Sequence, residues 1–527
     1  GRMTLEEKAR QLDMYTGLDT LLEKGQFDLP PHFGPKGGDI HAPNPEGIFT
    51  GNPTHAKADA KLNVALAEKV LGNLGVGCLH DIYPRPKLYN EIQRWVIGSN
   101  RLGIPALIFE EGLHGYMQFD QTLFPQSINL SSTWNRELAR KTGAAIATEA
   151  RANGVHMILG PVLDLARDAR WGRTEETFGE DPYLTGQLGL EFVEGMQGKS
   201  LADDNAVIAE PKHFAGHGSP ESGLNTAPVH VGEREMRSLM LKSFEPAVRE
   251  GKAMGIMAAY HDIDGLPVTA NPWLLNQVLR DEWGFQGIVV ADASAIRRLE
   301  KVHQVAPTMQ DAVCLALNSG VDVQFLDYPN EGYQGSIIEG VKSGKVSQAT
   351  LDAAVSRVLR AKFLLGLFDN PFVDESLDEK VRRNPDHLAL SHEVARQSIC
   401  LLKNAGDLLP LDASKLKTIA VIGPNANISR NGGYAEYAIE SAEGGILEGI
   451  KKLAPSSLNI LFDPGREIEP SVAIAKKADV VILGLGEKQG ISGENFDRMT
   501  LDLPGNQQEL LEAVVATGKP VVLVLLN

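Results

Sequence analysis

Several short apolar segments of the sequence end on a side chain that could take part in catalysis. In the clearest case, residues 287–292, four apolar residues run without alternation into the carboxylate of Asp292. So short an apolar run predicts a fully buried parallel strand. An acid at the carboxyl end of such a strand lies where α/β proteins place their catalytic groups. The alternative is that Asp292 caps the following helix, because Asp is a favoured N-cap residue.

Four other apolar segments, near 104–109, 155–163, 206–210 and 254–259, lead into polar residues in the same way. These residues include Glu111, Asp164, Arg173, Lys212, His213 and Tyr260. The carboxyl ends of parallel barrel strands meet at one face, so we expect a polar pocket there. Carboxylates, cations and a phenol can donate to and accept from the hydroxyls of a sugar ring. Taken singly, Asp164 and Arg173 could instead form a buried ion pair, and Tyr260 could lie at the rim.

Other reaction classes are less well supported. His213 and His217 are four residues apart, with Glu210 and Glu221 near, which brings zinc into consideration. However, Gly216 and Gly218 make a regular helix unfavourable there, so we expect no metal site and no cofactor. The sequence also lacks a complete phosphate-binding loop and the G-x-S-x-G motif of serine hydrolases.

The elements that must position these residues alternate regularly over the first 370 residues. Residues 4–15 have a capping box and helical spacing, and residues 25–57 are expected to form a long irregular loop. Further strands are expected near 74–79, 287–292 and 321–326, with helices near 134–151, 183–197, 233–250, 272–283 and 338–366. Strands alternating with helices over this length predict a (β/α)₈ TIM-like barrel in residues 1–370.

A second α/β domain is expected in residues 398–527, after a polar, proline-containing linker over 371–397. Its strands are predicted at 418–423, 459–462, 479–484 and 520–524, and its helices near 444–453, 470–477 and 506–517. Because a domain rarely ends on a buried strand, we expect the sequence to be a piece of a longer protein.

Composition excludes several classes of protein. The chain has 527 residues, 43% of them hydrophobic, and a formal net charge of −17. A negative protein lacks the basic surface that a nucleic-acid partner requires. The three cysteines, Cys78, Cys314 and Cys400, cannot form a disulfide framework. No apolar run reaches the ~20 residues that a membrane span requires.

The longest of these motifs resembles the signature of family-three glycoside hydrolases, the β-glucosidase and β-xylosidase family. Residues 167–183 read Arg-Asp-Ala-Arg-Trp-Gly-Arg-Thr-Glu-Glu-Thr-Phe-Gly-Glu-Asp-Pro-Tyr. Residues 212–214, 287–292 and 501–507 also follow that family's order. The resemblance implies a barrel followed by an α/β sandwich domain, with the site between them. It also implies a retaining, exo-acting β-glucosidase or exo-β-glucanase that acts on an oligosaccharide or β-glycoside, and export to the periplasm or medium.

The resemblance further assigns roles to individual residues. Asp292 is the implied nucleophile, and Glu494, in residues 490–498, matches the loop that supplies the acid/base in many members. Glu487 is the alternative acid/base, and either glutamate could instead be a solvated loop acid. The non-reducing-end sugar is expected to contact Glu111, Asp164, Arg173, Lys212, His213 and Tyr260.

The sequence departs from the family pattern in three places. Residues 212–218 are also similar to the N-acetylglucosaminidase branch, whose acid/base is an Asp-Ser-His sequence, but residues 219–225 contain no such dyad. Ala293 stands where many members have Trp, and Glu111 stands where many have Asp. β-Xylosidase, N-acetyl-β-glucosaminidase and a catalytically silent sugar-binding protein therefore remain as alternatives.

A retaining mechanism places requirements on the two carboxyl groups, which must lie ~5–5.5 Å apart. We expect Lys212 and Arg173 to keep Asp292 ionised. A less solvated setting poor in cations is expected to keep Glu494 protonated.

Overall fold

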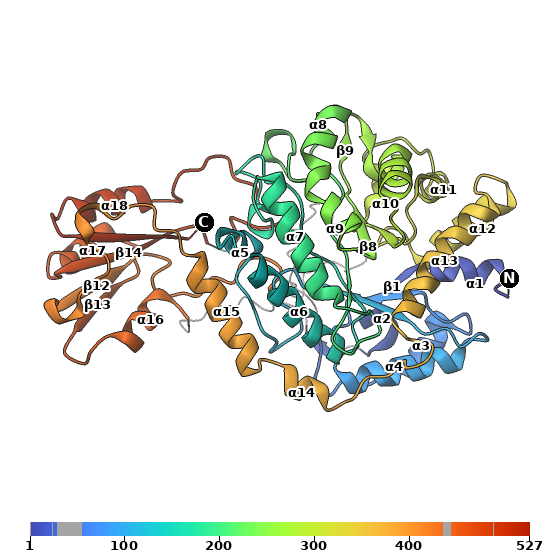
Figure 1. Cartoon of the computed structure of the whole chain (residues 1–527), viewed down its shortest axis with the longest axis horizontal. Coiled ribbons are helices and arrows are strands. Elements are labelled where there is room, and N and C mark those ends of the chain that lie inside the picture. The colour runs from blue at the N-terminus through green and yellow to red at the C-terminus, as the bar shows by residue number, and fades with distance from the viewer. Residues whose placement is uncertain (1, 24, 29–54, 436–443, 489, 527) are drawn as a thin grey trace.

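The structure is a computed structural model that describes residues 2–23, 25–28, 55–435, 444–488 and 490–526. Figure 1 shows two bodies side by side, a large one that carries the N-terminus and a smaller one built from the last quarter of the chain. The larger body is a β/α barrel and the smaller one is an α/β sandwich domain, so the predicted fold class is confirmed.

The barrel is a ring of short parallel strands. Its first five strands are adjacent in the order β1-β4-β5-β6-β7, and β8 pairs with β11. A parallel bridge between Phe214 and Ala258 joins the segment after β7 to β8. Another, between Val290 and Val323, joins β11 to the segment 321–326. The Gln324 N–H donates to the Leu12 carbonyl at 3.4 Å, which closes the ring. The strands are β1 (Met14–Thr16), β4 (Cys78–His80), β5 (Leu107–Glu110), β6 (Met157–Ile158), β7 (Ile208–Ala209), β8 (Gly255–Ala258) and β11 (Ile288–Ala291).

The N-terminal segment differs from the expected helix over 4–15. The predicted capping box between Thr4 and Glu7 is present, but helix α1 ends at Gln11. Met14 and Tyr15 are buried and pair in parallel with Cys78 and Leu79, so this stretch forms the first barrel strand. Closing the ring is the tertiary requirement that overrides the helical pattern. The 321–326 segment, expected as a strand, contributes only the single bridge at Val323.

Helices cover the outside of the barrel. The expected helix over 233–250 is divided into three short ones, and that over 338–366 into two. The segment 273–282 is a π-helix. The helices are α1 (Leu5–Gln11), α2 (Gly17–Leu21), α3 (Val64–Leu71), α4 (Pro86–Ser99), α5 (Ser127–Ser132), α6 (Arg136–Ala152), α7 (Pro182–Gln197), α8 (Glu233–Ser238), η3 (Met240–Ser243), α9 (Glu245–Arg249), η5 (Trp273–Glu282), α10 (Ala295–Lys301), α11 (Met309–Ser319), α12 (Asn330–Lys342) and α13 (Gln348–Leu364).

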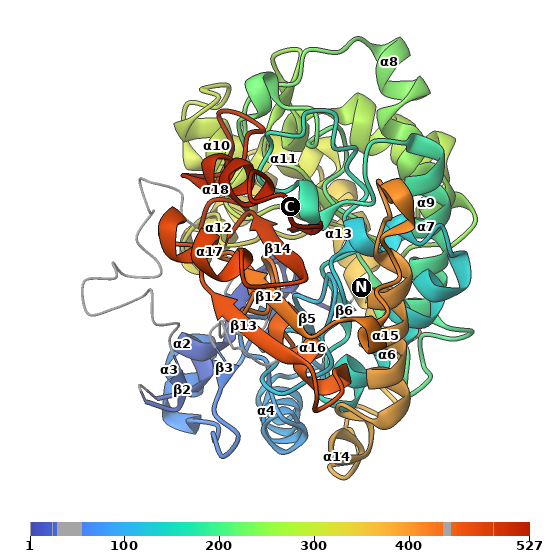
Figure 2. The ribbon, with the colours of Figure 1, turned by 90° about the vertical axis from the view of Figure 1, so that its left-hand side faces the viewer.

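The sandwich domain has a four-stranded parallel sheet in the order β13-β12-β14-β15. Separate apolar clusters, one including Leu483 and Leu510 and the other including Val421 and Leu447, cover its two faces, so helices pack on both sides. Figure 2 shows this domain facing the viewer in front of the barrel. Its elements are β12 (Thr418–Ile422), α16 (Ile446–Leu453), β13 (Asn459–Asp463), α17 (Ile468–Ala475), β14 (Val480–Gly486), α18 (Gln507–Val515) and β15 (Val521–Leu526).

The segment between the two bodies contains helices α14 (Leu377–Val381) and α15 (Pro385–Ser398). Helix α15 runs between the bodies in Figure 1 and contacts α5 and α6 of the barrel. Its His387 Nδ1 lies 2.7 Å from Glu149 Oε1 of α6. Strands β2 (Phe27–Asp28) and β3 (His55–Ala56) flank residues 29–54, so most of the predicted loop over 25–57 lies outside the described residues. Among the described helices, none is both long enough and apolar enough to cross a membrane.

Candidate active site

Asp292 directly follows β11 and is only 6% exposed. Its Oδ1 accepts a hydrogen bond from the adjacent Ala293 N–H at 2.7 Å. The next helix, α10, begins after Ser294, and no side chain caps it. The Asp292 carboxylate therefore does not cap the helix. Its Oδ2 makes no hydrogen bond to any described residue, and His213 Nε2 lies 3.9 Å away.

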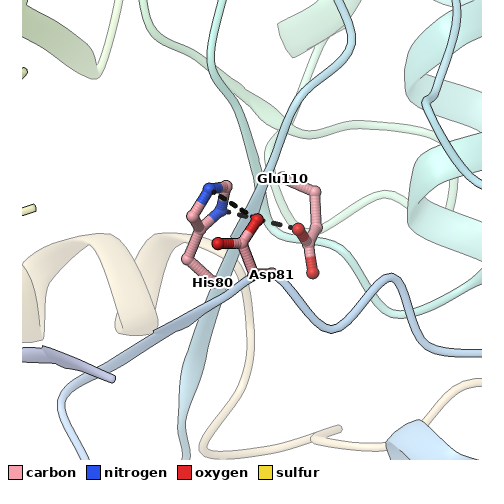
Figure 3. A group of neighbouring side chains, drawn as sticks. All are labelled: His80, Asp81 and Glu110. Atoms are coloured by element: carbon pink, nitrogen blue, oxygen red, sulfur yellow. Dashed lines mark ion pairs between the residues drawn. The ribbon is translucent and has the colours of Figure 1, made fainter. Parts of the chain in front are cut away.

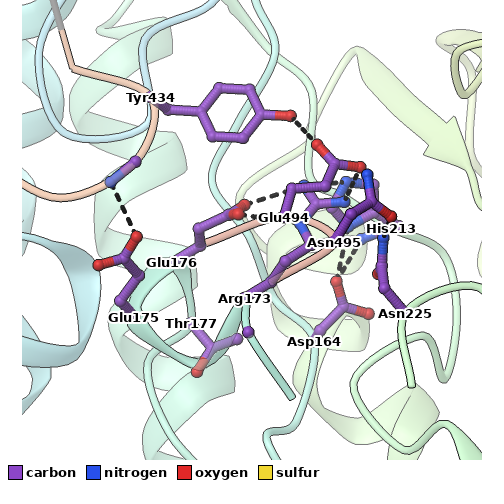
Figure 4. Close-up of polar contacts among 12 residues, drawn as sticks. Asp164, Arg173, Glu175, Glu176, Thr177, His213, Asn225, Tyr434, Glu494 and Asn495 are labelled. Atoms are coloured by element: carbon purple, nitrogen blue, oxygen red, sulfur yellow. Dashed lines mark hydrogen bonds and ion pairs between the residues drawn. The ribbon is translucent and has the colours of Figure 1, made fainter. Parts of the chain in front are cut away.

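Arg173 lies at the centre of the polar cluster in Figure 4 and is 1% exposed. Two parallel hydrogen bonds of 2.9 Å join its guanidinium to Glu176. Its Nη1 donates to Tyr260 Oη at 3.0 Å and to Glu494 Oε1 at 3.2 Å, and its Nη2 donates to His213 Nε2 at 3.0 Å. The fixed fork of donors on arginine suits such a junction. One side chain thus links residues that follow three barrel strands, β6, β7 and β8, with the second domain.

The contacts of His213 fix its protonation. Because arginine can only donate, His213 Nε2 must accept from Arg173. The Nδ1 atom therefore carries the proton and donates to Asp164 Oδ2 at 2.8 Å. Burial, reinforced by the charge of Arg173, lowers the pKa of His213 well below its usual value. Burial raises the pKa of Asp164 to about 7, against the opposing effect of the His213 backbone N–H. The ring is therefore a neutral, oriented imidazole.

Lys212 and Glu111 form a buried ion pair beside this cluster. Lys212 Nζ donates to both carboxylate oxygens of Glu111, at 2.9 and 3.2 Å. The Tyr434 ring, from the sandwich domain, lies 5.0 Å from Lys212 Nζ and 5.7 Å from the centre of the Arg173 guanidinium. An aromatic face attracts cations at such distances. Tyr434 therefore covers the two cations from the opposite side of the domain boundary.

Glu494 extends from the sandwich domain into the same cluster, as Figure 4 shows. Its Oε1 accepts from Tyr260 Oη at 2.6 Å as well as from Arg173, and its Oε2 accepts from Tyr434 Oη at 2.6 Å. Its side chain is 9% exposed. The expected low solvation is observed, but the expected lack of cations is wrong, because Arg173 forms an ion pair with it.

Glu487, the alternative acid/base, has different partners. It forms an ion pair with Arg498 of its own domain, and its backbone N–H donates to the Leu526 carbonyl at 2.7 Å. The structure thus brings Glu494, rather than Glu487, against Arg173 and Tyr260.

Main-chain contacts hold the Glu494 loop on the barrel. The Gly493 N–H donates to the Gly172 carbonyl at 2.8 Å. Asp497 Oδ1 accepts from the Gly172 N–H at 2.8 Å, and Oδ2 accepts from the Asn225 N–H at 2.7 Å. A Cβ atom at Gly172 would lie 2.2 Å from the Gly493 carbonyl oxygen, so this approach requires glycine. The two carboxylate oxygens of Asp497 and the backbone hydrogen bond between Gly493 and Gly172 therefore fix the position of the Glu494 loop relative to the barrel.

The turn that carries Tyr434 is also held by the barrel. The Gly433 N–H donates to Glu175 Oε1 at 2.8 Å. The Gly433 carbonyl accepts from Gln126 Nε2 at 2.8 Å, and His114 Nε2 lies 2.9 Å from the same oxygen. The barrel thus fixes both segments of the sandwich domain that contact Arg173, the Glu494 loop through main-chain groups and the Tyr434 turn through side chains.

The charge state of Asp292 reflects two opposing influences. Burial raises its pKa to about 8, and the negative charge of Glu494 also raises it, whereas Arg173 and Lys212 lower it. The two cations thus act in the expected direction, but burial outweighs them. Desolvation outweighs the cations because Glu176 and Glu111 already pair with them.

Four contributing residues were not predicted from the sequence: Glu176, Asn225, Tyr434 and Asp497. Glu176 lies within the quoted 167–183 motif, and its spacing of three from Arg173 was an available signal. Tyr434 follows two glycines, which marks only a loop. Asn225 and Asp497 act through backbone contacts between distant segments, for which the sequence carries no local signal. Lys212 and Phe214 form β-bridges and residues 215–218 form a turn, so the helical spacing considered for a zinc site at His213 and His217 does not arise there.

Comparison with protein families identifies the family of this chain. Residues 4–361 match the glycosyl hydrolase family 3 N-terminal domain, and residues 399–527 match the family's C-terminal domain. The chain belongs to glycosyl hydrolase family 3. The resemblance seen in the sequence is thereby confirmed.

Curated relatives align along most of this chain. A β-xylosidase of Formosa agariphila is 38% identical over 81% of the chain, and a periplasmic β-glucosidase of Salmonella typhimurium is 35% identical over 86%. The matched regions span 63% and 62% of those relatives' own lengths, so this chain corresponds to less than two-thirds of either protein.

Solved structures of family 3 agree in fold. A β-glucosidase of Erythrobacter marinus superposes with a TM-score of 0.85 at 31% identity, covering 100% of this chain and 70% of its own. A β-glucosidase of Listeria innocua in complex with glucose gives 0.83 at 29% identity, covering 100% of this chain and 68% of its own.

Proposed function

We propose that this family 3 member is a retaining, exo-acting β-glycoside hydrolase that releases the non-reducing-end sugar. The observation that carries the proposal is the convergence of two carboxylates from different domains on one buried group. Arg173 contacts Glu494 directly and contacts His213, whose Nε2 lies 3.9 Å from Asp292. A retaining glycosidase requires such a pair of carboxylates across one sugar.

In the proposed reaction, ionised Asp292 attacks the anomeric carbon and forms a glycosyl ester. Glu494 gives its proton to the departing oxygen and then takes a proton from the water that cleaves the ester. Arg173, Tyr260 and Tyr434 hold the Glu494 carboxylate in position between the two steps.

The remaining residues of the cluster are proposed to hold the sugar ring. Lys212 offers a donor, and Glu111 and Asp164 offer acceptors, all on buried side chains. Arg173 and His213 use their N–H groups within the cluster and are proposed to hold the groups that face the sugar in place. Tyr260 contributes a hydroxyl between Arg173 and Glu494. Such convergent, oppositely disposed groups suit the vicinal hydroxyls of a pyranoside.

We infer a β-glucosidase or exo-β-glucanase as the first candidate, and a β-xylosidase as the second. The second is favoured by the 38% identity to the Formosa agariphila β-xylosidase. An N-acetyl-β-glucosaminidase is less well supported, because residues 219–225 contain no Asp-Ser-His sequence. A sugar-binding protein without activity is the non-enzymatic alternative.

Chromogenic β-glucoside, β-xyloside and N-acetyl-β-glucosaminide substrates, assayed with and without chelator, test these candidates together. We expect hydrolysis of the glucoside or xyloside with the β-anomer released first, and retained in the presence of chelator as long as the protein stays folded. Binding of glucose without hydrolysis of any aryl glycoside would contradict the proposal. Inactivation by chelator with an unchanged melting temperature would indicate a metal hydrolase instead.

We also propose a periplasmic or secreted location, supported by the periplasmic β-glucosidase of Salmonella typhimurium, which is 35% identical. Fractionation of the source cells tests this, and activity confined to the cytoplasmic fraction would contradict it.

A further inference from the structure

Three side chains that can bind metal ions meet at the ends of two neighbouring barrel strands, apart from the Arg173 cluster. His80 ends β4, Asp81 follows it, and Glu110 ends β5, which pairs in parallel with β4. One ligand atom from each lies within 4.8 Å of the other two, and this is the one such group found among the described residues. Figure 3 shows the three side chains turned toward one another.

The orientation of His80 leaves one ring nitrogen available. Its Nδ1 lies 2.9 Å from the Phe109 carbonyl oxygen, which can only accept, so Nδ1 carries the proton. A metal-binding histidine usually donates its other N–H to a carbonyl or carboxylate in this way. The His80 Nε2 atom lies 3.3 Å from Asp81 Oδ1. Two ligands of a tetrahedral zinc, each 2.0–2.1 Å from the ion, lie about 3.3–3.4 Å apart.

Glu110 supplies a buried oxygen without a donor. Its side chain is fully buried, and Oε1 accepts from the backbone N–H groups of Ile82 at 3.0 Å and Tyr83 at 2.7 Å. Its Oε2 has no hydrogen-bond partner among the described residues. His80 Nδ1 lies 3.5 Å from Oε2, but its proton is directed to Phe109. Buried polar atoms are seldom left in this state, because the loss of hydration is uncompensated.

We propose that His80 Nε2, Asp81 and Glu110 Oε2 bind one divalent cation, and that this cation is zinc. One imidazole and two carboxylates form a donor set suited to zinc, whereas magnesium and calcium favour oxygen ligands alone. The Asp81 side chain is 22% exposed, which provides access for the ion and room for a water as fourth ligand.

The site has a structural consequence for the candidate active site. Glu110 immediately precedes Glu111, the ion-pair partner of Lys212. Zinc bound to Oε2, together with the two backbone hydrogen bonds to Oε1, would fix the Glu110 side chain and so the end of β5. The cation would therefore stabilise the barrel and position Glu111, without taking part in bond cleavage.

Zinc binding by the untagged, full-length protein tests the proposal independently of activity. The protein is stripped with a chelator, equilibrated with zinc chloride, and examined by elemental analysis, titration calorimetry and thermal unfolding. We expect one zinc per chain and a melting temperature that rises with zinc. Asp81→Asn and Glu110→Gln should each weaken zinc binding on the order of a hundredfold or more, since even changes of outer-shell partners cost 10–100-fold.

Glu149→Gln is the matched control, because it alters a buried histidine–glutamate contact, with His387 at 2.7 Å, that has no third ligand. This variant should bind zinc as the wild type does. If Glu110→Gln fails to fold, Asp81→Asn still tests zinc binding, because the Asp81 side chain is partly exposed. Absence of zinc binding in the wild type, or unchanged zinc affinity in Asp81→Asn, would overturn the proposal, as would selective binding of magnesium or calcium.

Discussion

Arg173 of the barrel donates to Glu494 of the sandwich domain at 3.2 Å, while its other terminal nitrogen donates to His213. This relationship makes one buried guanidinium the reference point for both proposed catalytic carboxylates. Neither domain alone contains the complete cluster. The chemistry proposed above therefore depends on how accurately the two domains are joined.

Asp292→Ala should abolish turnover, because no other carboxylate is placed to form the glycosyl ester. We expect kcat to fall on the order of 10⁴-fold or more, as when other enzymes lose an essential nucleophile or its partners. Azide can fill the space left by the side chain, and it should restore turnover of aryl β-glycosides with formation of an α-glycosyl azide. Activity like that of the wild type, or rescue giving the β-azide, would contradict the assignment.

Glu494→Ala should slow hydrolysis most for substrates that need protonation of the leaving group. Loss of general acid catalysis costs about 10²–10⁴-fold, whereas a dinitrophenyl glycoside, whose leaving group is already acidic, should retain much of its rate of bond cleavage. Glu487→Ala is the control, because that glutamate pairs with Arg498. An equal loss on both kinds of substrate would indicate a structural role for Glu494.

Glu494→Gln should shift the pH dependence of nucleophilic attack to lower pH. Burial, aided by the charge of Glu494, raises the pKa of Asp292 to about 8, so removal of that charge lowers it. Only ionised Asp292 attacks, so the rate of labelling by an activated 2-deoxy-2-fluoroglycoside should rise with pH in both proteins. The midpoint should come at a lower pH in the variant. An unchanged or higher midpoint would show that the two carboxylates do not interact.

Asp497→Asn should reduce activity without removing any group that touches the substrate. The amide keeps the size of the side chain but loses one of the two acceptors that bind the Gly172 and Asn225 N–H groups. A misplacement of ~1 Å of the Glu494 loop can cost on the order of a hundredfold. We expect the loss in kcat/KM on poor leaving groups to exceed that on activated ones. Asp502→Asn, an exposed acid of the same domain, should behave as wild type.

Much of the fold could be predicted because the signals are local. All four sandwich strands and most barrel strands are short apolar runs, and strand ends such as Asp292 and Lys212 mark the catalytic face. β1 was missed because its pairing with β4 depends on ring closure, which no local pattern encodes. The effect of burial on Asp292, which raises its pKa, was not anticipated either. The expectation treated Arg173 and Lys212 as unpaired cations next to Asp292, but Glu176 and Glu111 already neutralise their charges.

Residues that connect the two domains could not be predicted in the same way. Tyr434 and Asp497 act on partners more than 200 positions away, and nothing in their immediate sequence distinguishes them from ordinary loop residues. The family resemblance supplied Glu494 because its loop sequence is recognisable. It supplied no geometry for the hydrogen bonds that hold that loop.

The close approach of Gly172 and Gly493 has a consequence for how such an enzyme can diversify. Where two backbones touch directly, the anchor point is independent of the side chains around it. Apart from Asp497, whose carboxylate also binds the barrel, neighbouring positions of the 490–498 loop are then free to change in size and polarity while the carboxylate of Glu494 keeps its place. Preference for the departing group could thus be redesigned, or drift over generations, separately from the proton-transfer step.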